Sequence, residues 1–185
     1  LSKLFKVMKK EVVMTSSDNS LNKEKFKQAL HYIIFKAGVK DNVGKVVLYK
    51  MMYFSDFDFY EIYNKSITNE TYVKLPYGPG PSHFDSIVKE LKEEGKVEEK
   101  NSTYGGRPQK KVIPITEPRL DKLNGEEIKI IDRVINRLSG MSATQVTEHS
   151  HEDIPWKATE DGENIDYELV FYRNEKHSVS QSVLA

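Results

Sequence analysis

Apolar residues recur at helical spacing over the first organised part of the chain, residues 22–37. Asn22 is a residue type that caps helices, and Gly38 follows the last apolar position as a stop signal. The apolar positions, which share one helix face, are Phe26, Ala29, Leu30, Ile33, Ile34 and Ala37. This pattern predicts an amphipathic first helix.

The next segment, residues 43–63, carries large apolar side chains around its whole circumference. These apolar positions are too closely spaced around the helix to leave one face for solvent. They are Val46, Val47, Met51, Phe54, Phe57 and Phe59. A helix that is apolar on all sides belongs in the interior. We therefore expect this helix to be the central, largely buried element.

The following segments alternate turn formers with short apolar runs. Residues 72–75 are predicted to be extended and to lead into a rigid turn at the proline- and glycine-rich residues 76–81. Ser82 is the expected cap of a third helix that ends near Glu94. Residues 97–100 and 110–115 are predicted to form a hairpin, because Gly105 and Gly106 supply the positive φ angles of a tight turn.

Two further helices are expected at residues 126–138 and, capped by Ser142, at 143–150. The predicted fold class is thus mainly α, within the α+β class. It is a helical domain of about five to seven helices with a small β-hairpin, and the order of helix and hairpin is winged-helix-like.

The domain organisation follows from shifts in composition. Residues 1–20 are a basic, mildly apolar segment followed by a polar linker, and residues 21–175 form the domain. Residues 176–185 are predicted to be a flexible C-terminal tail, frayed from His177 onward because it is rich in serine.

Composition limits the possible functions. The chain has 185 residues, with 28 basic and 28 acidic side chains, so its formal net charge is zero. A neutral protein lacks the overall attraction that most nucleic-acid and anionic-membrane binders use. The absence of cysteine excludes thiolate chemistry and is typical of the cytoplasm. No apolar run reaches the roughly 20 residues of a membrane span, and the N-terminal residues lack the features of a secretory signal.

No pattern of catalytic or metal-binding residues is convincing. His149 and His151 lie in an acidic segment, but they are two residues apart and thus on different faces of a helix. Asp56 and Asp58 have the same spacing, and we expect a solvated or ion-paired helix face there. The glycine-rich stretches lack the lysine of a phosphate loop. The sequence therefore predicts a protein that is not an enzyme and binds no metal or cofactor.

Two sets of residues are candidates for binding a macromolecule. Tyr72, Tyr77 and Trp156 are large aromatics beside prolines, and they are either exposed anchors or loop residues packed on the core. The basic residues Arg107, Lys110 and Lys111 of the predicted hairpin are the alternative, a wing that contacts DNA phosphates. The third helix balances lysine with glutamate, which disfavours DNA contact by this domain alone.

An ordered series of motifs resembles one known family. The series is Lys50-Met-Met-Tyr-Phe-Ser-Asp56, Ser66-Ile-Thr68, Tyr72, the Tyr-Gly-Pro-x-Pro run at 77–81, Phe84, Ser142, Thr147-Glu-His149 and Pro155-Trp156. Over about residues 23–173 the chain is similar to the Panacea, or SocA-like, antitoxin domain. The resemblance implies a mostly helical fold with a small β element, and a bacterial or phage-borne antitoxin that neutralises a cognate toxin by direct binding.

The resemblance also implies alternatives and candidate residues. One branch of the family acts as an adaptor that delivers its toxin to a Clp-type protease, and some members carry an upstream helix-turn-helix domain, of which residues 1–14 are a candidate end. The candidate partner-binding residues are Tyr72, Tyr77, Pro79, Pro81, His149, Pro155 and Trp156. Residues 77–81 and 149–156 are expected to shape a groove, whereas Tyr53 and Phe54 are expected in the core.

Overall fold

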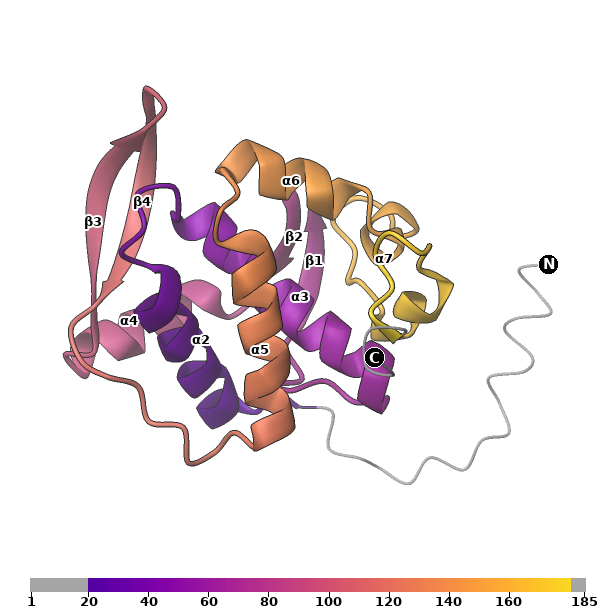
Figure 1. Ribbon diagram of the computed structural model, residues 1–185, viewed down its shortest axis with the longest axis horizontal. Helices are drawn as coiled ribbons and strands as arrows, with labels where there is room; N and C mark the ends of the chain where they lie inside the picture. Colours follow the sequence, from indigo (N-terminus) through magenta and orange to yellow (C-terminus); the bar gives the residue numbers. More distant parts are fainter. Residues whose placement is uncertain (1–19, 181–185) are drawn as a thin grey trace.

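One long helix, α3 (Lys45–Tyr63), runs through the middle of the molecule (Figure 1). The computed structural model describes residues 20–180. Helices α2 (Lys23–Ala37) and α5 (Gly125–Leu138) pack on α3 and on each other, while α6 (Ala143–His151) crosses it near its N-terminal half. Of the twelve buried residues of α3, several are polar, so this helix is enclosed by other elements and has little solvent face.

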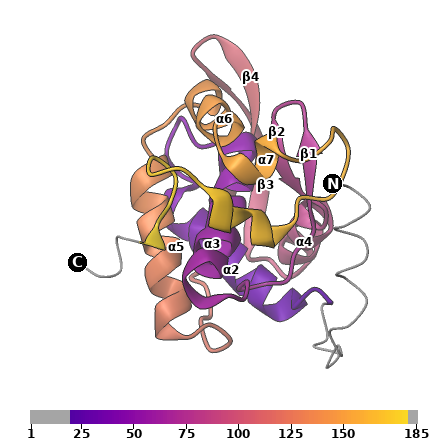
Figure 2. The same ribbon diagram turned by 90° about the vertical axis from the view of Figure 1, so that its right-hand side faces the viewer.

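The remaining elements surround this helical centre (Figure 2). Helix α4 (Phe84–Glu93) precedes the hairpin of β3 (Val97–Tyr104) and β4 (Arg107–Pro114). The short helix α7 (Ile154–Lys157) follows α6, and the 3-10 helix η1 (Tyr167–Tyr172) lies against α3 and α7. Within residues 20–180 there are six α-helices and one 3-10 helix, so the mainly helical α+β class is confirmed.

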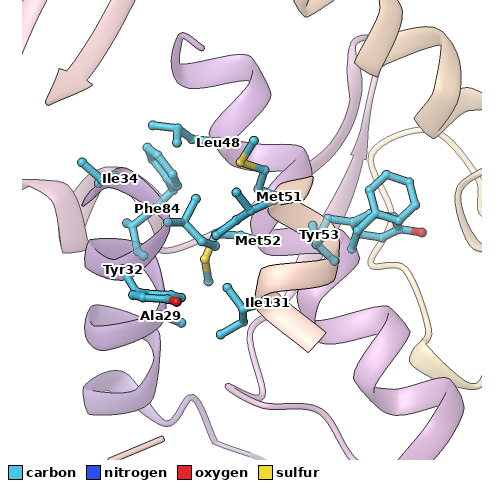
Figure 3. Packing of buried hydrophobic residues seen from close by; sticks show 14 of the residues in the cluster. Ala29, Tyr32, Ile34, Leu48, Met51, Met52, Tyr53, Phe84 and Ile131 are labelled. Carbon is cyan, nitrogen blue, oxygen red and sulfur yellow. The ribbon is translucent and has the colours of Figure 1, made fainter. Parts of the chain in front are cut away.

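The core lies between α2, α3, α4 and α5 (Figure 3). From α3, Leu48, Met51 and Met52 face Ile34 of α2 and Ile131 of α5, and all five are fully buried. Each such side chain contributes roughly 1.5–3 kcal/mol relative to an exposed one. Tyr53 and Phe54, expected in the core, are at most 1% exposed. The predicted central position of this helix is therefore confirmed.

The proline- and glycine-rich segment differs from the rigid turn that we expected. Strand β1 (Tyr72–Leu75) pairs antiparallel with β2 (Gly78–Pro81), and Tyr72 stands opposite Pro81. Only Pro76 and Tyr77 form the turn. The outer edge of β1 bonds to residues 162–165, whereas β2, which carries Pro79 and Pro81, is the edge strand, where proline is tolerated. All four residues of β2 are buried against neighbouring helices.

Several helix ends match the sequence signals, and one does not. The side chain of Asn22 accepts a hydrogen bond from the Lys25 N–H, and Ser142 forms a capping box with Gln145. The predicted cap at Ser82 is wrong. The N-cap residue of α4 is His83, and its side chain makes no capping hydrogen bond. The carboxylate of Glu70 instead accepts the N–H of His83 at 2.9 Å.

Asp56 and Asp58 correct the expectation of a solvated helix face, because both are at most 2% exposed. Asp56 accepts hydrogen bonds from the N–H groups of Ile67 and Thr68, and from the hydroxyls of Thr68 and Tyr72. Burial raises the pKa of Asp56 to about 6, although the bonds from Thr68 and Tyr72 lower it. The carboxylate thus fixes the loop after α3 onto that helix.

Asp58 belongs to a buried group of charges, as the ion-paired alternative predicts. The guanidinium of Arg173 lies between Asp58, Glu61 and Asp153, at distances of 2.7 to 2.9 Å. Arg137 reaches the other oxygen of Asp58 at 2.8 Å. These bonds attach the segment after η1 to α3 and to the α6–α7 junction.

The segment that follows differs from the frayed tail expected from His177 onward. His177 is 6% exposed, and its Nε2 lies 3.0 Å from the carbonyl oxygen of His149. The N–H of Val179 and the hydroxyl of Ser178 donate to Glu61. Residues 177–180 are thus part of the packed domain. Residues 181–185, and residues 1–19 of the predicted N-terminal segment 1–20, lie outside the described residues.

Candidate protein-binding site

A groove runs along α6, between the β3–β4 hairpin and the β1–β2 turn. It consists of two hollows of about 400 and 380 Å³ that share Arg107, Ala143 and Thr144. We call it the α6 groove. The remaining lining residues are Val46, Tyr77, Thr147, Glu148 and His151 in the first hollow, and Tyr104, Gly105, Pro108, Gln109 and Ser142 in the second.

Tyr77 forms one wall of the α6 groove because of the residue that follows it. Gly78 has a φ of +101°, and a Cβ at this position would lie 2.4 Å from Oγ of Ser150 and 2.7 Å from Cε of Lys50. Only glycine fits such a close approach in this backbone conformation. The strand is therefore held down while the Tyr77 side chain projects outward, 74% exposed.

Trp156 supports the groove from behind. Its ring stacks on His151, with centroids 4.1 Å apart, and Nζ of Lys74 lies 4.3 Å from the ring centroid on a cation–π contact. The indole N–H donates to the carbonyl oxygen of Leu75 at 3.3 Å. Trp156 thereby orients His151 and ties α7 to the β1–β2 turn.

A buried lysine lies below the groove. Lys50 of α3 is 1% exposed, and no group described within residues 20–180 pairs with its ammonium. Burial lowers the pKa of Lys50 to about 8. Burial lowers the pKa of His151, a backbone hydrogen bond with Pro76 opposes this effect, and the positive charges of Lys50 and Lys74 lower the pKa further. Nε2 of His151 is buried without a hydrogen-bond partner.

His149 faces the opposite side of α6 from His151, as their spacing predicts. Its ring lies 5.2 Å from that of Phe54 and stacks on His177 at 4.7 Å. Burial, together with the charges of His177 and Arg137, lowers the pKa of His149 to about 4. His149 therefore joins the C-terminal segment to the core, and it does not line the groove.

The structure divides the seven candidate partner-binding residues into two sets. Tyr77 lines the α6 groove, and Trp156 stands directly behind it. The others form the frame: Tyr72, Pro79, Pro81 and Pro155 are buried, and His149 is half-buried on the far side of the helix. Sequence reasoning missed Val46, Thr147 and Lys50. Lys50 and Thr147 begin two of the family motifs, but no local signal assigns these three residues to a groove, because the relative placement of their helices defines it.

The predicted basic wing is only partly available to a ligand. Arg107 and Lys110 are exposed on β4. Lys111 is 8% exposed, and its ammonium donates to the carbonyl oxygen of Lys40. Alternate side chains of a strand point to opposite faces, which places Lys111 against the domain while Lys110 faces outward.

Two negative observations concern the described part of the chain. Within residues 20–180, no three His, Cys, Asp or Glu side chains gather closely enough to hold a metal ion. Over the same range, no helix combines the length and apolar character needed to cross a membrane.

The fold and the groove define a mainly helical α+β domain with an open, aromatic-walled surface. Residues 48–157 match the family described as antitoxin SocA-like, Panacea domain. The match covers more than half of the 185 residues, so the chain belongs to this antitoxin family and has, in general terms, a toxin–antitoxin role. Comparison with curated proteins and with solved structures gives no match.

Proposed function

We propose that this protein neutralises a cognate toxin by binding it directly, and that the α6 groove is the contact surface. Family membership supports the antitoxin role. The exposed Tyr77 on the wall of a concave surface is the observation that favours this location. Tyrosine combines a large apolar ring with a polar hydroxyl, and exposed tyrosines are therefore typical anchors of protein interfaces.

The groove combines features of a protein-binding surface. Tyr77 and Tyr104 lie at its two ends, 74% and 42% exposed, and Leu75 next to the first is 42% exposed. Arg107 and Glu148 are exposed on the groove and have no ion-pair partner within residues 20–180. Aromatic anchors surrounded by unpaired charges of both signs fit a protein partner better than a nucleic acid. The action proposed here is stoichiometric binding in the cytoplasm, without chemistry.

The test is coexpression of this chain with the product of the adjacent open reading frame, followed by copurification and a binding titration. Tyr77→Ala is expected to weaken binding at least about tenfold without changing the melting temperature. Tyr172→Ala is the matched control, because Tyr172 is 71% exposed on η1, outside the groove. It is expected to bind like the wild type.

Equal binding by the Tyr77→Ala variant would remove the groove from the proposal while leaving direct neutralisation standing. If the wild type rescues growth without forming a complex, direct neutralisation is wrong. Protease-dependent loss of the toxin would then indicate a Clp-type adaptor. Steeply salt-dependent binding to duplex DNA, lost with Arg107→Ala and Lys110→Ala, would indicate the other alternative, a winged-helix DNA-binding transcriptional regulator.

A further inference from the structure

The unpaired ammonium of Lys50 is costly to the fold. A charge taken out of water loses its hydration, and only an opposite charge or hydrogen-bond acceptors compensate for this loss. The other deeply buried charges of this protein have such partners: Arg173 contacts three carboxylates, and Asp56 accepts four hydrogen bonds. Lys50, 1% exposed, has neither kind of partner among residues 20–180.

A second unpaired polar group lies nearby. Nε2 of His151 is buried and has no hydrogen-bond partner, although the ring is held in place by Trp156. Within residues 20–180 the other buried ring nitrogen without a hydrogen-bond partner is Nδ1 of His177, on the far side of α6. Such atoms are unusual in a native protein, so Nε2 of His151, near the charge of Lys50, indicates a position that a ligand completes. Ser150, whose hydroxyl donates to Thr147, is already satisfied.

Both groups adjoin the α6 groove. His151 lines its first hollow, and so does Val46, which precedes Lys50 by one turn of α3 and therefore shares its helix face. A Cβ on Gly78 would lie 3.0 Å from Nζ of Lys50, so the strand directly after Tyr77 covers the ammonium. The exposed turn residues Pro76 and Tyr77 come directly before Gly78, and Tyr77 lines this edge of the groove.

We propose that Lys50, with His151, is the binding point for one acidic side chain, an aspartate or a glutamate, that the toxin inserts into the α6 groove. The inference rests on the proposed function and adds the chemistry of the partner. Lys50 does not line the hollow itself, so insertion includes a small displacement of the exposed Tyr77 side chain and turn. The carboxylate then supplies the ammonium with the partner that the free protein lacks.

A single carboxylate fits this site better than a phosphate or a nucleic acid. The groove offers one buried ammonium, and Arg107 is the one further basic side chain among its lining residues besides His151. Glu148, exposed on the same hollow, would repel an anion with several charges. A protein side chain also brings apolar neighbours that cover the rings of Tyr77 and Tyr104.

The first test replaces Lys50 with methionine, which is apolar and of similar length, and measures melting temperature and toxin affinity. Removing an unpaired buried charge is expected to raise the melting temperature, whereas affinity for the toxin falls at least about tenfold. Lys129→Met, an exposed lysine of α5, is the control and is expected to change neither. Unchanged affinity, or a fall in both quantities, overturns the inference, because the latter outcome makes Lys50 a structural residue.

The second test needs no substitution in the complex. The side-chain NMR signal of Lys50, assigned by its absence from the Lys50→Met spectrum, gives its pKa in the free protein and in the toxin complex. A carboxylate beside the ammonium raises this pKa, so an increase on binding is expected. An unchanged pKa overturns the inference. A wild type that does not bind the toxin contradicts the proposed function itself, which the Lys50 variant cannot do.

Discussion

Arg173 and Asp153 are joined by two parallel hydrogen bonds, from Nε to Oδ1 at 2.9 Å and from Nη2 to Oδ2 at 2.7 Å. Asp153 begins α7 and also accepts the hydroxyl of Tyr53, at 2.9 Å. The pair therefore connects the C-terminal segment, the α6–α7 junction and the central helix in the interior. Because α6 forms one side of the groove, this pair positions the candidate site without lining it.

Removing Arg173 is expected to destabilise the whole domain. Arg173→Met leaves Glu61 and Asp153 without their cation and Asp58 with Arg137 alone, and breaking one partner of a buried ion pair costs about 3–5 kcal/mol. Denaturant unfolding measures the change. Arg107→Met, on the exposed hairpin, is the control and is expected to shift the free energy of unfolding by less than about 0.5 kcal/mol. Equal effects of the two substitutions would contradict this role.

Gly78→Ala is expected to lower the free energy of unfolding by about 2 kcal/mol or more. The added Cβ would meet Ser150 and Lys50 at contact distances that side chains do not adopt, and the φ of +101° adds backbone strain. Gly105→Ala separates these two causes, because Gly105 also has a positive φ, +55°, but no atom within 4 Å of a Cβ. Its expected cost is roughly 1 kcal/mol. If both variants lose the same free energy of unfolding, the close approach of Gly78 to Ser150 and Lys50 has no measurable cost.

The stability of the free protein is expected to rise between pH 7 and pH 9 because of Lys50. Burial lowers its pKa in the fold to about 8, from the ordinary value of 10.5. Between these values the unfolded chain binds more protons than the folded one, so stability increases as the pH rises through 8. This group alone contributes about 1 kcal/mol over that interval.

The measurement is the difference in unfolding free energy between Lys50→Met and the wild type at the two pH values. Other titrating groups are common to both proteins, so the difference isolates Lys50. The advantage of the methionine variant is expected to be largest at pH 7 and to shrink at pH 9. A difference that stays constant would mean that Lys50 does not titrate in this interval.

The amino-acid sequence by itself determined the elements with strong local signals. Asn22 caps α2, Ser142 and Gln145 form the capping box of α6, and Gly105-Gly106 close the β3–β4 hairpin, as predicted. These signals act between residues a few positions apart, so they can be read without knowing the fold. The ordered motifs also indicated the antitoxin family, which the match over residues 48–157 confirms.

Only the tertiary structure decided which polar side chains are buried and which aromatic residues are free. Tyr72 and Tyr77 look alike in sequence, yet one is 1% and the other 74% exposed. The reason is that the Tyr72 ring packs against Tyr53 and Phe57 of α3, while the turn that carries Tyr77 projects outward. Asp56 and Lys50 both lie on α3. The carboxylate of Asp56 accepts hydrogen bonds from the loop that follows the helix, whereas no acceptor within residues 20–180 meets the ammonium of Lys50. Burial and pairing depend on which elements come together across the chain, and no local pattern contains that information.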